Sequence, residues 1–168
     1  MSLSSLLQTG CLIVFALLLL LAAWQDLRSM QIADGLSLGI VGVFAVWAAA
    51  GLLGGMISFW SIALMFACAV GVFALGALAF AVGMLGGGDV KLLAAASLFA
   101  GPSLMLDFIT AVALAGGLLG VAILAGAPIG SATPTPDGTL RTRLRGDLPY
   151  GPAIAAGGLW LAVLLAPV

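Results

Sequence analysis

The sequence predicts an all-α integral membrane protein, and three observations carry this prediction. Of its 168 residues, 64% are hydrophobic and only 7% are charged, whereas a soluble domain carries about 25% charged residues. The mean hydropathy is +1.33. Several apolar stretches also approach the roughly 20 residues that a helix needs to cross a bilayer. This composition excludes a soluble globule, a disordered chain and a nucleic-acid binder that works through a basic face.

The apolar stretches predict about six transmembrane helices. Their approximate bounds are residues 3–24, 36–53, 59–84, 90–106, 108–127 and 149–166. The fourth stretch is interrupted by Gly101 and Pro102, and proline kinks or shortens a membrane helix. The many glycines and alanines suit close helix–helix contact, because lipid supplies no hydrophobic drive for helices to associate.

The cations predict how the chain is oriented in the membrane. Every basic residue falls in or beside the first, third or fifth connection between the predicted helices: Arg28, Lys91, Arg141, Arg143 and Arg145. The positive-inside rule therefore places these connections in the cytoplasm and both chain termini on the non-cytoplasmic side. Residues 1–168 are expected to form one membrane-embedded domain with a flexible cytoplasmic loop at about 126–147. The three loop arginines are expected to contact anionic lipid headgroups.

The residue types that are missing limit the chemistry. The chain contains no histidine and no glutamate, which excludes Ser-His-Asp and Cys-His hydrolases, histidine-ligated zinc sites and glutamate bases. Cys11 and Cys68 both lie within predicted helices and are expected to behave as small apolar side chains. We expect no metal and no cofactor.

The aspartates are the candidate functional residues, because a charge at membrane depth costs about 2.5–3.5 kcal/mol. Asp107 lies between two apolar stretches and is expected to cap the helix that follows it. Asp26, Asp34 and Asp89 lie at the cytoplasmic ends of predicted helices. Helix capping would explain Asp34 and Asp89 taken singly.

Capping does not explain the three glycines, Gly86, Gly87 and Gly88, that directly precede Asp89. Three glycines free the backbone from the helix and let another chain approach closely. Two carboxylates that share a proton beside one water form an aspartyl hydrolase, the one hydrolytic mechanism that this composition readily permits. Lys91 lies about 200° around a helix from Asp89, so we expect it to contact headgroups or a loop rather than the carboxylate pair.

Three segments resemble the type IV prepilin peptidase family. Residues 86–95 (GGGDVKLLAA) resemble its Gly-x-Gly-Asp-x-Lys-Leu-Leu motif, and residues 26–38 (DLRSMQIADGLSL) resemble its first aspartate motif. Residues 148–155 (LPYGPAIA) are similar to the segment that opens the last helix of many members. The segments occur in the family's order, although Ala33 stands where the family usually has proline.

The resemblance implies a six-helix aspartic endopeptidase of the inner membrane that cuts prepilins or pseudopilins at the cytoplasmic face, just before an apolar helix. By position, Asp26 and Asp89 would be the catalytic pair. Asp34 is a third carboxylate in the same region and remains an alternative partner for Asp89. Asp34, the three glycines and Lys91 would bind substrate or support the site. Without a cytoplasmic domain in the first connection, the chain resembles the peptidase-only members of Flp-type pilus systems, which lack methyltransferase activity.

Three alternatives remain open at this point. The boundary aspartates could serve a small ion- or proton-coupled transporter, although none of them is expected in the middle of a helix. They could merely cap helices in a non-catalytic assembly protein. A presenilin-like protease shares Gly-x-Gly-Asp, but the first and third segments argue against it.

Overall fold

The computed structural model describes residues 3–125 and 149–166, and its regular structure there is entirely helical. The helices are α1 (Leu3–Ser29), α2 (Asp34–Leu53), α3 (Phe59–Ala81), α4 (Gly87–Leu124) and α6 (Gly151–Leu165). The first four are long and apolar enough to cross a membrane, whereas α6 is a shorter apolar helix of 15 residues. The prediction of an all-α membrane protein is therefore confirmed. The predicted loop at about 126–147, with its three arginines, lies outside the described residues.

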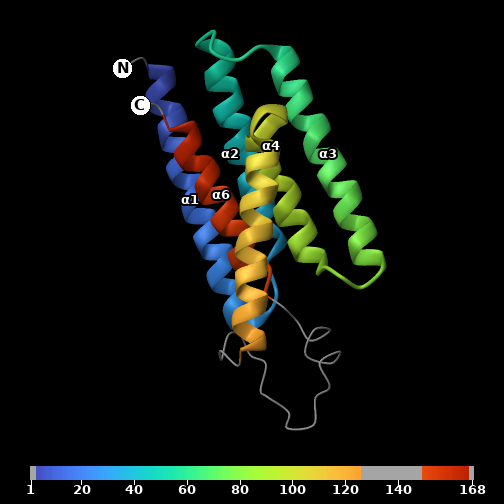
Figure 1. The fold of residues 1–168 in the computed structure, drawn as a ribbon. Coiled ribbons are helices and arrows are strands. Elements are labelled where there is room, and N and C mark those ends of the chain that lie inside the picture. The colour runs from blue at the N-terminus through green and yellow to red at the C-terminus, as the bar shows by residue number, and fades with distance from the viewer. Residues whose placement is uncertain (1–2, 126–148, 167–168) are drawn as a thin grey trace.

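Helix α4 consists of two helices joined at a sharp bend. Gly101 has φ 54° and ψ −170°, a conformation that is essentially restricted to glycine, and Pro102 follows it. Figure 1 shows that the chain reverses direction there, so that the two halves of α4 run in opposite directions. These halves correspond to the predicted fourth and fifth spans, but the break lies several residues earlier than the predicted one. Asp107 is consequently inside the second half, and its predicted capping role is wrong.

The connections alternate between the two ends of the helical bundle. Figure 1 shows the α1–α2 and α3–α4 connections at one end, and the α2–α3 connection at the other end beside the start of α1 and the finish of α6. Arg28 and Lys91 belong to the first of these ends, which follows the arrangement expected from the distribution of cations. We call it the aspartate end, because Asp26, Asp34 and Asp89 also lie there.

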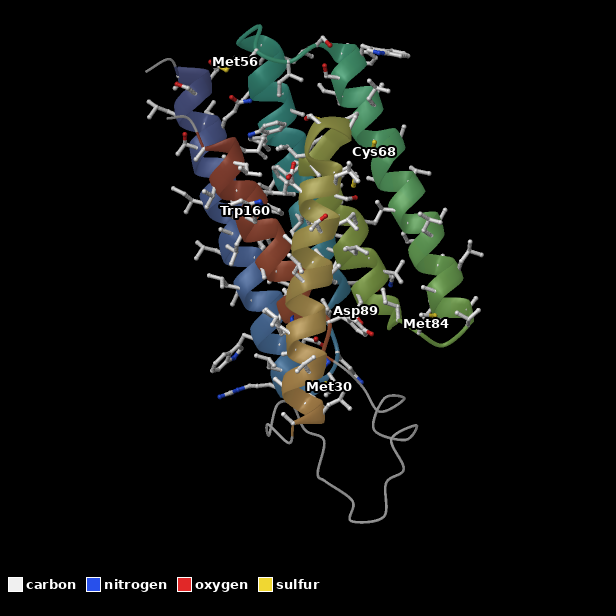
Figure 2. The ribbon with its side chains drawn as sticks, viewed as in Figure 1. Met30, Met56, Cys68, Met84, Asp89 and Trp160 are labelled. Carbon is white, nitrogen blue, oxygen red and sulfur yellow. The ribbon has the colours of Figure 1, made fainter. Side chains whose placement is uncertain are left out.

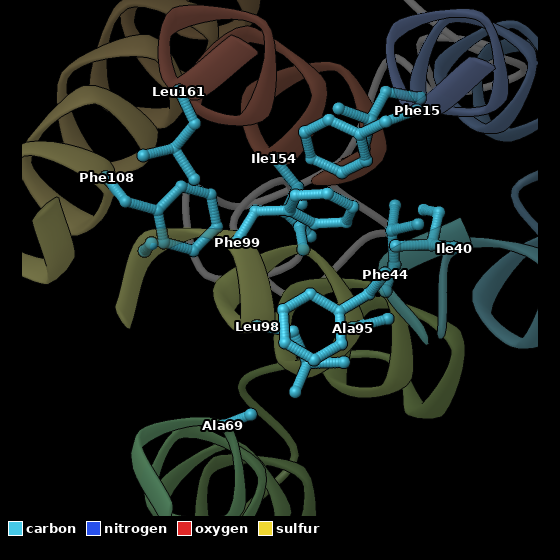
Figure 3. Close-up of a cluster of buried hydrophobic side chains, with 14 of the residues drawn as sticks. Phe15, Ile40, Phe44, Ala69, Ala95, Leu98, Phe99, Phe108, Ile154 and Leu161 are labelled. Carbon is cyan, nitrogen blue, oxygen red and sulfur yellow. The ribbon is translucent and has the colours of Figure 1, made fainter. Parts of the chain in front are cut away.

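Aromatic rings fill the middle of the bundle. Phe15 of α1 stacks on Phe99 of α4 with ring centroids 4.2 Å apart, and Phe99 also contacts Phe44 and Trp47 of α2. Figure 3 shows Phe15, Phe44 and Phe99 converging between the helices, with Ile154 of α6 beside them. Offset and edge-on ring pairs of this kind hold a packed core together.

Glycines let α6 lie close to its neighbours. A Cβ added at Gly157 would come within 2.4 Å of Val112 Cγ2, and one at Gly158 within 2.4 Å of Leu19 Cδ1. The prediction that small residues serve close helix packing is confirmed at these two positions. By contrast, α3 carries large exposed apolar side chains along its length, including Phe66, Phe73 and Leu75, as expected for a helix that faces lipid.

Candidate functional site

The structure buries Asp26 near the end of α1, against the start of α6. The carboxylate is only 5% exposed, and its Oδ2 accepts a hydrogen bond of 2.8 Å from the backbone N–H of Gly151, the first residue of α6. The positive end of a helix dipole therefore faces this carboxylate. A Cβ at position 151 would lie 2.7 Å from Asp26 Cβ, so only glycine permits this approach.

Asp89 is buried in the first turn of α4 and is 8% exposed. It is the third residue of the helix, not the residue that caps it, because Gly86 occupies the cap position. The alternative interpretation of Asp89 as the N-cap residue therefore does not hold, because Asp89 lies three residues after the cap position. Its Oδ2 nevertheless accepts a hydrogen bond of 3.3 Å from the Gly86 N–H, as an acidic residue does at the third position of a capping box. Its Oδ1 is buried and has no partner among the described residues.

Asp26 and Asp89 are the two buried carboxylates at the aspartate end, one near the end of α1 and the other at the start of α4. Within residues 3–125 and 149–166, neither carboxylate has a cation as partner, because the one salt bridge there joins Lys91 to Asp34. Figure 2 shows Asp89 at the same end of the bundle as Met30 and Met84, which border the two connections of that end. Burying two carboxylates without a neutralising cation lowers the stability of the folded membrane protein.

Asp34 has a different environment from the other two aspartates. It begins α2 and is 66% exposed, and its Oδ1 accepts a 2.7 Å hydrogen bond from the Lys91 ammonium. It is not an N-cap, because Ala33 occupies that position. Lys91 therefore contacts the start of α2 rather than the buried pair, in line with its predicted position on the far side of the helix from Asp89.

The three glycines that precede Asp89 do not form the expected extended loop, because Gly87 and Gly88 are already helical. These glycines let neighbouring groups approach the backbone closely. A Cβ at Gly86 would lie 2.7 Å from Asp89 Oδ2, and one at Gly88 would lie 3.2 Å from Cβ of Ile32 in the α1–α2 connection. The neighbouring chain that these glycines admit is thus the connection between α1 and α2.

A hydrogen bond fixes the α1–α2 connection at Ala33, the position where the family that the sequence resembles usually has proline. Ala33 adopts φ −66°, close to the value that a proline ring imposes. Its backbone N–H donates a 3.0 Å hydrogen bond to the side-chain oxygen of Gln25, a bond that proline could not make. The reduced rigidity expected from Ala33 is therefore offset by Gln25.

Two features of this region were not found from the sequence as parts of the site. Gly151 belongs to a segment that resembles the family, but the sequence did not predict that its amide donates a hydrogen bond to Asp26. Ser37 is 7% exposed, and its Oγ has no partner among the described residues. No sequence signal distinguishes this serine from an ordinary helical one.

No group of three metal-ligating side chains occurs in the described part of the chain.

The arrangement supplies the elements of acid–base chemistry. Two carboxylates arrive from different helices, one buried oxygen of Asp89 has no hydrogen-bond partner among the described residues, and the helix start at Gly151 holds Asp26. Carboxylates placed in this way can divide the roles of general base and general acid between them.

A comparison with known protein families gives one match. The model of the type IV leader peptidase family matches residues 13–121, a segment that contains both buried aspartates. Neither the curated proteins nor the solved structures gave a significant match. Because the family model covers more than half of the chain, the protein belongs to the type IV leader peptidase family.

Proposed function

We propose that the protein is an aspartic endopeptidase of the inner membrane that removes the leader peptide of Flp-like prepilins or pseudopilins at the cytoplasmic face. The observation that carries the proposal is the pair formed by Asp26 and Asp89. Both carboxylates are buried at one end of the bundle, and both lack a cation among the described residues. Membership of the family supplies the reaction type.

In the proposed mechanism, the two aspartates share one proton, because like charges so close do not both ionise cheaply. The ionised carboxylate takes a proton from a water molecule, whose oxygen attacks the scissile carbonyl carbon. The protonated carboxyl hydrogen-bonds to the carbonyl oxygen as negative charge develops there. The C–N bond then breaks, and the leaving nitrogen takes up a proton from the pair. We assign the two roles to the pair as a unit.

The alternative of a transporter gains no support from the fold. A proton or cation path needs polar groups through the middle of the bundle, and that middle is filled by the stacked rings of Phe15, Phe44 and Phe99. Among the residues that the structure describes, the buried carboxylates lie only at the aspartate end.

The proposal is tested by co-expressing the chain with an Flp-type prepilin and following leader removal by the mass of the pilin. The wild type should produce the shortened pilin, and Asp89→Asn should leave the precursor intact at an equal membrane level of the enzyme. Asparagine keeps the size of aspartate and accepts a hydrogen bond, so a purely structural cap would survive this change. A precursor that stays uncleaved by the wild type would reject the proposed activity.

A further inference from the structure

A groove opens between α2 and α3 on the outside of the bundle. Both helices pack on the first half of α4, and the space that they leave has a volume of about 430 Å³. Its walls and floor are largely apolar and include Leu38, Val41, Phe66, Val70, Phe73 and Ala94. Several of these side chains are exposed, among them Val41 and Phe73.

One end of this groove is polar, and it is the aspartate end. Asp34 and Lys91 line it there, and Ser37 contributes a buried hydroxyl that has no partner among the described residues. Lys91 follows Asp89 by two residues on α4, a rise of about 3 Å along the helix. The groove therefore leads from an apolar surface to the aspartate end of the bundle, where Lys91 and Asp89 lie on opposite faces of the start of α4.

We propose that this groove holds the apolar helix of the substrate, with the first turn of that helix beside Ser37 and the Asp34–Lys91 pair. The inference rests on the proposed function, in which the scissile bond comes just before an apolar helix. A helix seated in this direction would bring the segment before it to the aspartate end, and that segment would pass the start of α4 to reach Asp26 and Asp89, while the helix itself stays against apolar side chains.

The polar end of the groove is complementary to the start of a helix. The first four N–H groups of a helix have no partner within it, and they carry the positive end of the helix dipole. Ser37 Oγ has no partner among the described residues, and the exposed Asp34 carboxylate offers further acceptor positions beside Lys91. A lipid acyl chain has no polar group to satisfy Ser37, so an acyl chain matches only the apolar part of the groove.

A second groove provides an internal control. It lies between α1 and α2, has a larger volume of about 610 Å³, and is lined by apolar side chains such as Leu7, Val14 and Val46. No charged side chain lines it. Val14 precedes Asp26 by about 18 Å along α1 at 1.5 Å per residue. If apolar surface alone attracted the substrate, this groove would serve at least as well.

Val41 and Val46 form a matched pair for the test, because both are exposed valines of α2 and each lines a different groove. A photoreactive residue at each position would be combined with Asp89→Asn, which keeps the prepilin uncleaved, and cross-links to the prepilin helix would be located by mass spectrometry. We expect the Val41 position to give at least tenfold more prepilin adduct than the Val46 position. Equal yields, a preference for Val46, or only lipid or self adducts at Val41 would overturn the inference.

Processing by the same photoreactive chains without Asp89→Asn separates the two proposals. A prepilin that is processed but does not cross-link from Val41 refutes the groove and leaves the peptidase standing. A prepilin that the wild type does not process refutes the peptidase itself.

A kinetic measurement gives a second, independent readout. Val41→Trp would fill the groove and is expected to raise KM for the prepilin at least fivefold, whereas Val46→Trp should leave KM within twofold of the wild type. If Val41→Trp leaves KM unchanged, the substrate helix does not occupy this groove.

Discussion

The contact between Gly151 and Asp26 makes Gly151→Ala the most informative single substitution. The added Cβ would lie 2.7 Å from Asp26 Cβ and 2.8 Å from its Oδ2, so α6 or the carboxylate must move. That movement lengthens or breaks the 2.8 Å hydrogen bond that fixes Asp26. A hydrogen bond to a charged group contributes about 1.5–3 kcal/mol, and each 1.4 kcal/mol corresponds to a factor of ten. We therefore expect kcat for prepilin cleavage to fall by about 10- to 150-fold.

Two glycine variants control for effects on folding. A Cβ at Gly117 would meet no atom within 4 Å, so Gly117→Ala should change neither activity nor melting temperature. A Cβ at Gly157 would lie 2.4 Å from Val112 Cγ2, so Gly157→Ala should lower the melting temperature while the folded fraction keeps its kcat. If Gly151→Ala cleaves prepilin as fast as the wild type, the Gly151 amide does not position a catalytic carboxylate.

Three further substitutions test the bend, the core and the glycine before Asp89. Gly101→Ala forces a side chain into a conformation that costs about 1–3 kcal/mol, and its Cβ would lie 3.0 Å from Met65 Cγ; a lower melting temperature in detergent is expected, and an unchanged one would contradict the bend. Phe99→Ala removes a fully buried ring that contacts three other rings and should destabilise the fold by about 3–5 kcal/mol, measured by reversible unfolding in mixed micelles. Gly86→Ala would place a Cβ 2.7 Å from Asp89 Oδ2; we expect it to reduce the cleavage rate about tenfold or more, as loss of a charge-assisted hydrogen bond would, at an unaltered melting temperature.

The helices could be predicted from the sequence because each one corresponds to a single continuous run of apolar residues. Long apolar runs set the approximate bounds of α1, α2 and α3, and the alternation of cations anticipated which connections share an end of the bundle. The bend in α4 was located less well. Apolar residues continue past Gly101 as far as Leu106, so hydropathy marks no break there. Gly101 and Pro102 mark the interruption in the sequence, but only the structure shows that the chain reverses direction there.

The aspartates of the candidate site could be named from the sequence and their catalytic role stays a prediction, but the contacts that surround them could not be predicted. Asp26 and Asp89 were recognised by motif, and the structure buries both. The Gly151 bond to Asp26 spans 125 residues, and the Lys91 bond to Asp34 spans 57. Both depend on how the helices pack, which no local pattern encodes. The free Ser37 hydroxyl and the groove beside it follow from the same packing.

The central claim is that Asp26 and Asp89 together activate water, and it is tested most directly with purified protein in lipid nanodiscs. Initial rates of prepilin cleavage would be compared for the wild type, Asp26→Asn, Asp89→Asn and Asp34→Asn. The account predicts a loss of at least about 100-fold for each of the first two variants. It also predicts that Asp34→Asn keeps its kcat at saturating prepilin within about fivefold of the wild type, because Asp34 lies in the proposed groove, outside the carboxylate pair, and an exposed ion pair contributes at most about 1 kcal/mol. An Asp89→Asn or Asp26→Asn protein that keeps most of the wild-type rate would contradict the proposed mechanism.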